Sequence, residues 1–262
     1  QSIERHGVGS NAWKQKRLDQ IVAHWGRFEP IMNQPAGQGA TVEFVFRNAK
    51  QVEFEAQQIN LPKLLDDVKA YLTQNPQRID GRKIQIEDLG WRLVTENDQQ
   101  YLGKSVASWT QELQPRERHF DRRITISTPL VNAGVYLLTA KVKEGNVSKM
   151  VVWVSDTAIV HKQLSGKNYY FVADAVTGQP VSGANVEFFG FRQQPLNPRR
   201  LVVQTKNFAE RADADGQVIL DPAALSQEYQ WLVIARGGRG RLAHLGFRGV
   251  WTGDYYDAQY EE

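Results

Sequence analysis

The sequence predicts a mainly β protein made of two tandem immunoglobulin-like β-sandwich domains with a short N-terminal helical segment. Its 262 residues suit two domains of about 100–200 residues each better than one. Short segments in which apolar and polar residues alternate recur along the chain. Turn-forming Gly, Pro, Asn and Asp separate them. We expect an N-terminal helix and linker at 1–37, a first sandwich with an inserted helix at 38–155, and a second sandwich at 156–262.

The N-terminal helix is predicted from the spacing of apolar residues. Between positions 13 and 28 they recur at three- and four-residue steps, as on one face of a helix. They are Trp13, Leu18, Ile21, Val22, Trp25 and Phe28. Pro30 and the Gly-containing stretch 34–39 should end this helix and form the linker.

The first sandwich is predicted from a change to a two-residue period. Residues 41–47 and 51–56 alternate, and Arg47-Asn48-Ala49-Lys50 lies between them, which predicts a hairpin. Leu61 to Leu72 returns to a helical rhythm and should cross one end of the sheet. Further strands are expected around Ile84/Ile86, Ile124/Ile126, Val135–Val142 and Val147–Val154.

The second sandwich is predicted from seven short strand-like segments with no long helix, a pattern typical of immunoglobulin-like folds. They are Ala158–His161, Asn168–Val176, Ala184–Phe191, Leu201–Thr205, Gln217–Leu220, Gln230–Arg236 and Arg241–Val250. Turn residues lie between them at 177–180, 214–216 and 237–238. A domain boundary is therefore expected near Ser155.

The composition is that of an ordinary globular protein. Hydrophobic residues make up 41% and charged residues 23% of the chain, and the formal net charge is +3. So small a charge makes nucleic acid a poor default partner. No apolar run reaches the roughly 18 residues of a membrane span. The chain has no cysteine, which excludes disulfides, thiolate metal sites and thiol nucleophiles within it.

A set of segments in the second half resembles a known family. The segments are Gly134–Leu137, Val151–Val160, Tyr169–Ala184, Val186–Phe189, Ala212–Val218 and Tyr229–Arg236. They resemble consecutive macroglobulin-like domains in the N-terminal part of bacterial alpha-2-macroglobulins, most strongly over residues 130–255. The Asp-x-x-Thr-Gly-x-Pro turn at 174–180 also resembles carboxypeptidase-regulatory-type repeats. The order of the segments, in which a strand ending at Ser155-Asp156 leads directly into the next sandwich, favours the macroglobulins.

The resemblance implies a series of macroglobulin-like β-sandwiches and a role in trapping proteases that cut a bait segment. It also implies a periplasmic or cell-surface, extracellular location. The expected partners are neighbouring domains of a parent chain and, through the intact parent, proteases. Many family members use an internal thioester in a Cys-x-x-Gln setting. Since this chain has no cysteine, no functional residue is carried over.

Several motifs suggest a site but fail in their context, so no catalytic, cofactor-binding or metal-binding residue is predicted. Asp213-Ala214-Asp215-Gly216 lacks the later ligands of a calcium loop, and a hairpin turn is the better interpretation. Arg236 to Arg241 resembles an RGG box, but it occurs once between strands and predicts a glycine hairpin with solvated arginines. No metal-ligand spacing links the histidines, which lie at His6, His24, His119, His161 and His244.

Aromatic residues are the remaining feature. Alternate pairs such as Tyr169/Phe171 and Phe189/Phe191 are expected to fill a sandwich core or an interdomain contact, with a carbohydrate platform as the other interpretation. The segment from Trp251 to Tyr260 is expected to pack against a following domain.

The resulting prediction is a non-catalytic scaffold fragment of an alpha-2-macroglobulin-like endopeptidase inhibitor, not an enzyme. One alternative is an immunoglobulin-like adhesion or glycan-binding module of a secreted or surface protein. Another is an accessory domain of a secreted hydrolase.

Overall fold

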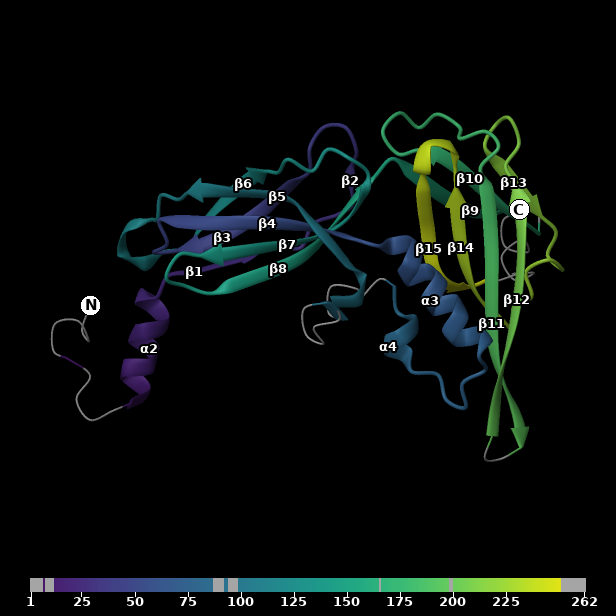
Figure 1. Cartoon of the computed structure of the whole chain (residues 1–262), viewed down its shortest axis with the longest axis horizontal. Coiled ribbons are helices and arrows are strands. Elements are labelled where there is room, and N and C mark those ends of the chain that lie inside the picture. The colour runs from purple at the N-terminus through teal and green to yellow at the C-terminus, as the bar shows by residue number, and fades with distance from the viewer. Residues whose placement is uncertain are drawn as a thin grey trace, which may run out of the picture. The chain divides into compact units, whose positions relative to one another are not determined.

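The computed structural model confirms a mainly β chain built from several antiparallel sheets (Figure 1). It describes Gly7 and residues 12–86, 92–93, 99–164, 166–197 and 200–250. Contacts divide the chain into two units. The first comprises Gln1–Gln34, Gln38–Ile59 and Leu102–Val154. The second comprises Pro35–Gly37, Asn60–Tyr101 and Ser155–Glu262.

The first unit contains two sheets. The three-stranded sheet has the order β1-β3-β6, from Trp25–Phe28, Thr41–Arg47 and Arg122–Ser127. The other has the order β2-β8-β7-β4-β5, from Gln34–Pro35, Val147–Ser155, Gly134–Val142, Gln51–Ile59 and Leu102–Glu112. The helix α2, Ala12–Val22, precedes β1, and a 3-10 helix, Glu117–His119, precedes β6.

The expected helix over residues 13–28 is too long. It ends at Val22, and Trp25–Phe28 forms β1, which pairs with β3. Gly26 explains the change, because a Cβ at this position would lie 2.4 Å from the Phe44 ring. The glycine therefore lets β1 lie close against the aromatic core. The apolar residues Trp25 and Phe28 fit a helical spacing only by coincidence.

The expected hairpin between residues 41 and 56 is also wrong. Both strands exist, but β3 and β4 belong to different sheets, so the chain crosses from one sheet to the other at the corner. Asn48 has a φ of 60°, and Ala49 is fully buried there. The apolar faces of the two strands meet across the core, where the Phe44 and Phe54 ring centroids lie 5.6 Å apart.

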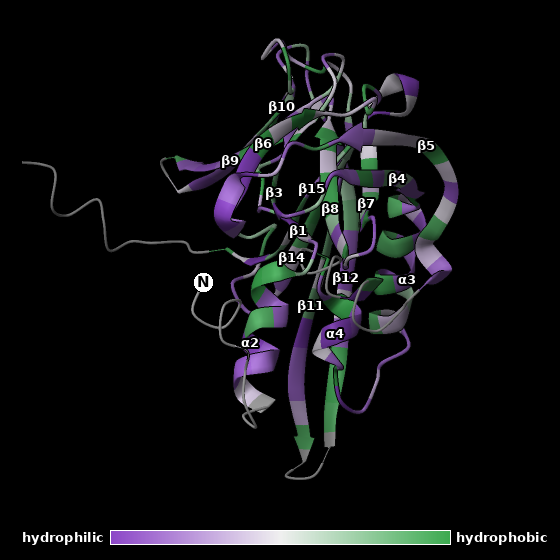
Figure 2. Ribbon diagram, turned by 90° about the vertical axis from the view of Figure 1, so that its left-hand side faces the viewer, coloured by the Kyte–Doolittle hydropathy of each residue, from purple (hydrophilic) through white to green (hydrophobic). Residues whose placement is uncertain are grey.

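Strand β5 was not expected from the sequence. It lies at the edge of its sheet, paired with β4 alone, and both of its faces are largely exposed. Figure 2 accordingly shows mainly hydrophilic and neutral residues along it. An edge strand without a buried face has no alternation from which it could be predicted.

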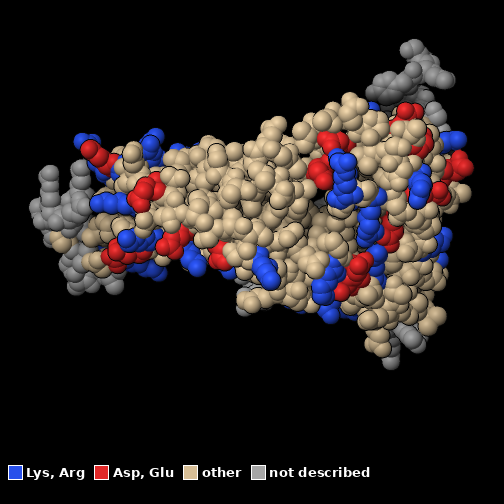
Figure 3. All heavy atoms as spheres, turned by 45° about the horizontal axis from the view of Figure 1, so that its top comes forward, with Lys and Arg blue, Asp and Glu red and all other residues tan. Residues whose placement is uncertain are grey.

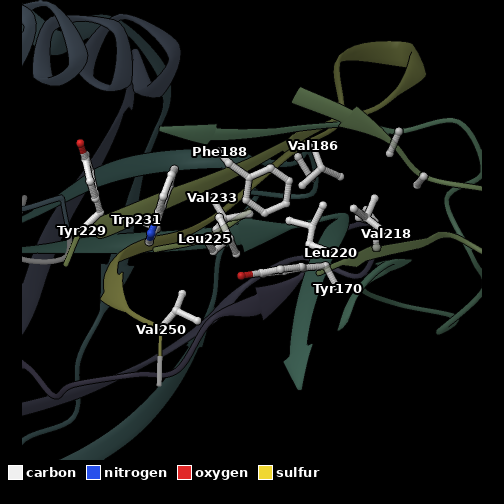
Figure 4. Close-up of a cluster of buried hydrophobic side chains, with 14 residues drawn as sticks. Tyr170, Val186, Phe188, Val218, Leu220, Leu225, Tyr229, Trp231, Val233 and Val250 are labelled. Carbon is white, nitrogen blue, oxygen red and sulfur yellow. The ribbon is translucent and has the colours of Figure 1, made fainter. Parts of the chain in front are cut away.

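The second unit contains a sandwich of two sheets. One has the order β13-β10-β9, from Gln217–Leu220, Lys167–Asp174 and Thr157–Leu164. The other has the order β12-β11-β14-β15, from Arg200–Arg211, Asn185–Asn197, Gln230–Arg236 and Leu242–Gly249. Tyr170, Phe188 and Trp231 lie between the sheets in a continuous apolar core (Figure 4).

Helix α3, Leu61–Thr73, forms where the sequence predicts a helix. The Asn60 side chain caps it by accepting a hydrogen bond from the Lys63 N–H, and Pro62 lies in the first turn, where proline is tolerated. Its apolar residues are buried, namely Leu61, Leu64, Leu65, Val68 and Leu72.

The position of α3 differs from the expected domain boundaries, because Asn60–Tyr101 belongs to the second unit and not to the first. Lys69 of α3 contacts Glu187 of β11 at 2.8 Å. Asn75, just after the helix, accepts a hydrogen bond from the Val203 N–H of β12 at 2.7 Å. The helix therefore packs on the sheet that contains β11 and β12.

The strand expected around Ile84/Ile86 is wrong as well. Gly81–Ile84 forms the short helix α4, whose first turn is capped by the Asp80 side chain. The Asp80 carboxylate accepts a hydrogen bond from the Arg82 N–H, which favours a helical turn over an extended chain.

Gly183 provides a test of the turn before β11. Its φ is 68°, and a Cβ there would meet no atom within 4 Å, so substitution strains only the backbone. We expect Gly183→Val to cost about 1–3 kcal/mol of unfolding free energy, measured by urea denaturation. Gly238→Val is the control, since Gly238 also faces open space but has no left-handed φ. Equal midpoints for the two variants would contradict the turn assignment.

Candidate functional site

The turn that carries much of the family resemblance is held by one carboxylate. Asp174 Oδ1 accepts hydrogen bonds from the Thr177 N–H at 2.8 Å and the Val176 N–H at 3.0 Å. Arg241 Nη2 donates to Asp174 Oδ2 at 2.7 Å. Arg241, followed by these backbone donors, holds the pKa of Asp174 far below its usual range. Asp174 is therefore ionised at physiological pH and anchors the turn.

The Arg236–Arg241 segment forms the expected glycine hairpin between β14 and β15, with Gly237 N–H donating to Arg241 O. The expectation of solvated arginines is wrong for two of the three. Arg236 lies 2.7 Å from Glu187, and Arg241 pairs with Asp174. Neighbouring elements supply these carboxylates, which a local reading of the sequence does not reveal. Arg239, at the tip, is exposed.

Asp213–Gly216 forms a local turn. Asp213 Oδ1 accepts hydrogen bonds from the Asp215 and Gln217 N–H groups, and Gly216 has a φ of 72°. The strands on either side, β12 and β13, lie in different sheets, so the predicted hairpin is instead a crossing between sheets. Among the described residues, no three His, Asp or Glu side chains are grouped in a way that could hold a metal ion.

None of the described histidines belongs to a group of three potential metal ligands. His119 contacts Asn48, and His161 stacks on Tyr170 with 4.5 Å between ring centroids. Burial lowers the pKa of His244 to about 4, so this imidazole stays neutral at physiological pH. His6 lies outside the described residues.

A cavity of about 350 Å³ lies beside α3 and α4 in the second unit. Its described lining residues are Asp67, Tyr71, Asp80, Arg82, Lys83, Arg92, Gln100 and Tyr101. Asp67 pairs with Lys63, and hydrogen bonds from Arg82 lower the pKa of Asp80. Each carboxylate is thus engaged by a cation. The lowered pKa of Asp80 does not suit a general base or acid near neutral pH.

The outer face of the β13-β10-β9 sheet exposes several apolar side chains. Residues on this face alternate with core residues on β10 and β13, and those on β9 lie opposite residues of this face of β10 in register. They include Val160, Lys162, Leu164, Tyr169, Phe171 and Ile219. Val160, Leu164 and Ile219 are 45%, 52% and 55% exposed. We call these six residues the apolar face and treat it as the candidate interaction site.

The apolar residues on this face are neighbours through the strand register. Val160 pairs with Phe171, and Tyr169 pairs with Ile219. Cross-strand neighbours lie about 5 Å apart, so the four side chains form one continuous patch. Lys162, opposite Tyr169, adds a positive charge at the β9 edge.

The apolar face changes the assignment of two aromatic residues. Tyr169 and Phe171 are not in the core, because Tyr170 and Val172 occupy it. An interdomain contact and a carbohydrate platform remain as interpretations of this pair. Phe189 and Phe191 are buried, but they alternate with the core residues Val186 and Phe188 and so lie on the other face of β11, outside the sandwich core. Because residues 169–171 are three consecutive aromatics, the sequence alone does not show which of them point into the core. The segment from Trp251 to Tyr260 lies outside the described residues.

Charges elsewhere on the surface are mixed. On the face shown in Figure 3, Lys and Arg side chains lie among Asp and Glu side chains. In the described part of the chain, no helix is long and apolar enough to cross a membrane.

Comparisons with known proteins indicate the class of fold. No family model matches the chain, and no curated protein matches it by sequence. A structure of native alpha-2-macroglobulin from Escherichia coli spanning domains NIE-MG1 matches with a TM-score of 0.52 and 15% identity, over 86% of this chain and 97% of that one. A second, spanning domains MG0-NIE-MG1, matches with a TM-score of 0.51 and 15% identity, over 87% of this chain and 65% of that one.

The chain therefore has a tandem β-sandwich fold. More particularly, it is the fold of the NIE-MG1 segment of a bacterial alpha-2-macroglobulin, and this confirms the fold that the sequence resemblance implied.

Proposed function

We propose that this chain is a non-catalytic scaffold segment of an alpha-2-macroglobulin-like, protease-trapping protein. The observation on which the proposal rests is the match to the NIE-MG1 segment, which extends over 97% of that structure. This structural match is a separate observation from the sequence resemblance in the Tyr169–Ala184 region. Together they favour a macroglobulin over an unrelated immunoglobulin-like repeat.

The side chains support a structural role. Asp174 of the motif turn and Arg236 and Arg241 of the β14–β15 hairpin are engaged in ion pairs that hold elements of one unit together. The apolar face instead offers an exposed patch suited to packing. A scaffold domain works through such packed interfaces, which transmit shape changes between domains.

The proposal places the chain in the periplasm or at the cell surface. Its partners would be the neighbouring domains of the parent chain. Proteases would be partners only through the intact parent, where bait cleavage takes place.

The coding sequence adjoining residue 262 tests this proposal. We expect further β-sandwich domains and a bait segment. A catalytic domain there would instead support an accessory domain of a hydrolase, and an array of adhesion repeats would support the adhesion or glycan-binding alternative. Either result would contradict the scaffold proposal.

A further inference from the structure

A second cavity, of about 200 Å³, lies at one edge of the sandwich core of the second unit. Residues of β9, β10, β14 and β15 line it, together with Val250. Its floor consists of side chains that are at most 5% exposed, namely Tyr170, Trp231, Val233 and Val250. His161 and Arg248 also line it and are exposed. The cavity therefore has a buried floor and a mouth that is open to solvent.

The size and lining of this cavity suit one aromatic ring. An apolar cavity of about 150 Å³ holds a benzene molecule, so a ring with a short substituent fits here. None of the described residues that line the cavity is acidic. Arg248 pairs in register with Trp231, so its side chain is on the same face of the sheet. The cavity thus combines an apolar floor with a positive charge at its mouth.

The Tyr170 hydroxyl is a buried donor that faces this cavity. Figure 4 shows it pointing toward the space between Trp231 and Val250. No residue in the described part of the chain forms a hydrogen bond with this hydroxyl. Burial raises the pKa of Tyr170, so the hydroxyl keeps its proton. Because a buried hydroxyl is normally hydrogen-bonded, an incoming acceptor would supply the missing partner.

The ring that carries this hydroxyl is fixed in place. His161 stacks on Tyr170 with 4.5 Å between ring centroids, and Phe188 packs edge-on against Tyr170 at 5.0 Å. His161 is itself held, because its Nε2 lies 3.2 Å from Oδ1 of the fully buried Asn168. The donor is therefore preorganised, which lowers the entropy that binding costs.

We propose that this cavity binds a small aromatic carboxylate of the size of phenylacetate. The ring of the ligand packs between Trp231 and the aliphatic side chains of Val233 and Val250. Its carboxylate accepts a hydrogen bond from the Tyr170 hydroxyl, and the Arg248 guanidinium favours the negative charge. The inference does not depend on the proposed function, since every lining residue belongs to the second unit.

Titration of the purified chain with phenylacetate, followed by ¹H–¹⁵N NMR, tests this proposal. We expect saturable shifts at the amide of Gly249, which lines the cavity. The Kd should be on the order of 0.1–1 mM, as for a ligand of about ten non-hydrogen atoms. Acetate lacks the ring and benzylamine carries the opposite charge. Both should bind at least about tenfold more weakly than phenylacetate.

Tyr170→Phe removes the hydroxyl and keeps the ring. We expect phenylacetate to bind roughly tenfold more weakly, the size of one hydrogen bond to a charged group. The melting temperature should stay the same or rise, because the hydroxyl has no hydrogen bond within the described chain to lose. Tyr169→Phe is the matched control, since Tyr169 lies on the other face of β10, and its affinity should equal that of the natural protein. Arg248→Gln should weaken binding by roughly twofold to fivefold, the size of an exposed charge pair.

The absence of saturable binding up to about 20 mM phenylacetate would overturn the proposal. Equal affinities of the Tyr170→Phe variant and the natural protein would also overturn it, because the hydroxyl would then take no part. Acetate that binds as well as phenylacetate would indicate an adventitious anion only, and equal binding of benzylamine would contradict the selection of a carboxylate.

Discussion

Replacing Trp231 by alanine should destabilise the second unit more than any other single change considered. Trp231 is 1% exposed and lies in the core between the two sheets (Figure 4). Its indole N–H donates to Ser226 O at 3.0 Å. Gly190 makes room for the ring, since a Cβ there would lie 2.7 Å from it. Removing the indole leaves a cavity that the packed sheets cannot close, and we expect a loss of about 3–5 kcal/mol.

Urea denaturation followed by near-UV circular dichroism measures this loss. Leu196→Ala is the matched control, because Leu196 is in the same unit but 62% exposed, and we expect a change within about 0.5 kcal/mol. Similar losses for the two variants would mean that Trp231 does not lie in a closed core.

Replacing Glu187 by alanine should have the second largest effect. Glu187 joins two elements, with Lys69 Nζ at 2.8 Å and Arg236 Nη1 at 2.7 Å. Its side chain is 12% exposed, so its loss leaves two cations close together with little solvent screening. We expect a cost of about 3 kcal/mol, at the low end of the range for a broken buried ion pair.

The pH dependence of stability distinguishes this ion pair from simple packing. Burial raises the pKa of Glu187, but the hydrogen bonds from Lys69 and Arg236 lower it by more, so its pKa is below the ordinary 4.5. Stabilisation by Glu187 is therefore present above pH 4.5 and is lost as the pH falls through the lowered pKa. The difference in unfolding free energy between the natural protein and Glu187→Ala should shrink below pH 4.5. A difference independent of pH would contradict the ion pair.

Strand positions in the second unit could be predicted because the strands are amphipathic and bounded by turn residues. Gln217–Leu220 and Gln230–Arg236 form strands at the expected residues. Their buried side chains alternate with exposed ones or form an apolar run, and Gly or Asp residues lie near their ends. The local pattern of apolar residues and turn residues is sufficient to predict the position of such strands.

The partner of each element could not be predicted, because it depends on contacts between distant residues. An alternating pattern shows that β3 and β4 each bury one face, but it does not show that they lie in opposite sheets. The apolar residues of α3 likewise predict a buried helix without indicating which sheet covers it. The contact between Lys69 of α3 and Glu187, 118 residues away, identifies that sheet, and nothing in the sequence near α3 points to it.

The apolar face could be found only in part. Tyr169 and Phe171 were recognised as residues of a core or a contact, but three consecutive aromatics leave the inward side undefined. The register with β9 and β13 resolves it, since Val160 and Ile219 are on the same side and exposed. Single-strand patterns do not contain that register.

Protease protection tests the scaffold proposal most directly. The purified chain is mixed in molar excess with several endoproteases of different specificity, and cleavage of a large protein substrate and a small peptide is followed in parallel. We expect the chain alone to hydrolyse neither substrate and to protect neither, because trapping requires a bait segment and the shape change of a complete parent. Full protection of the large substrate while the small peptide is still cleaved would be the behaviour of a complete trap, and it would contradict the account.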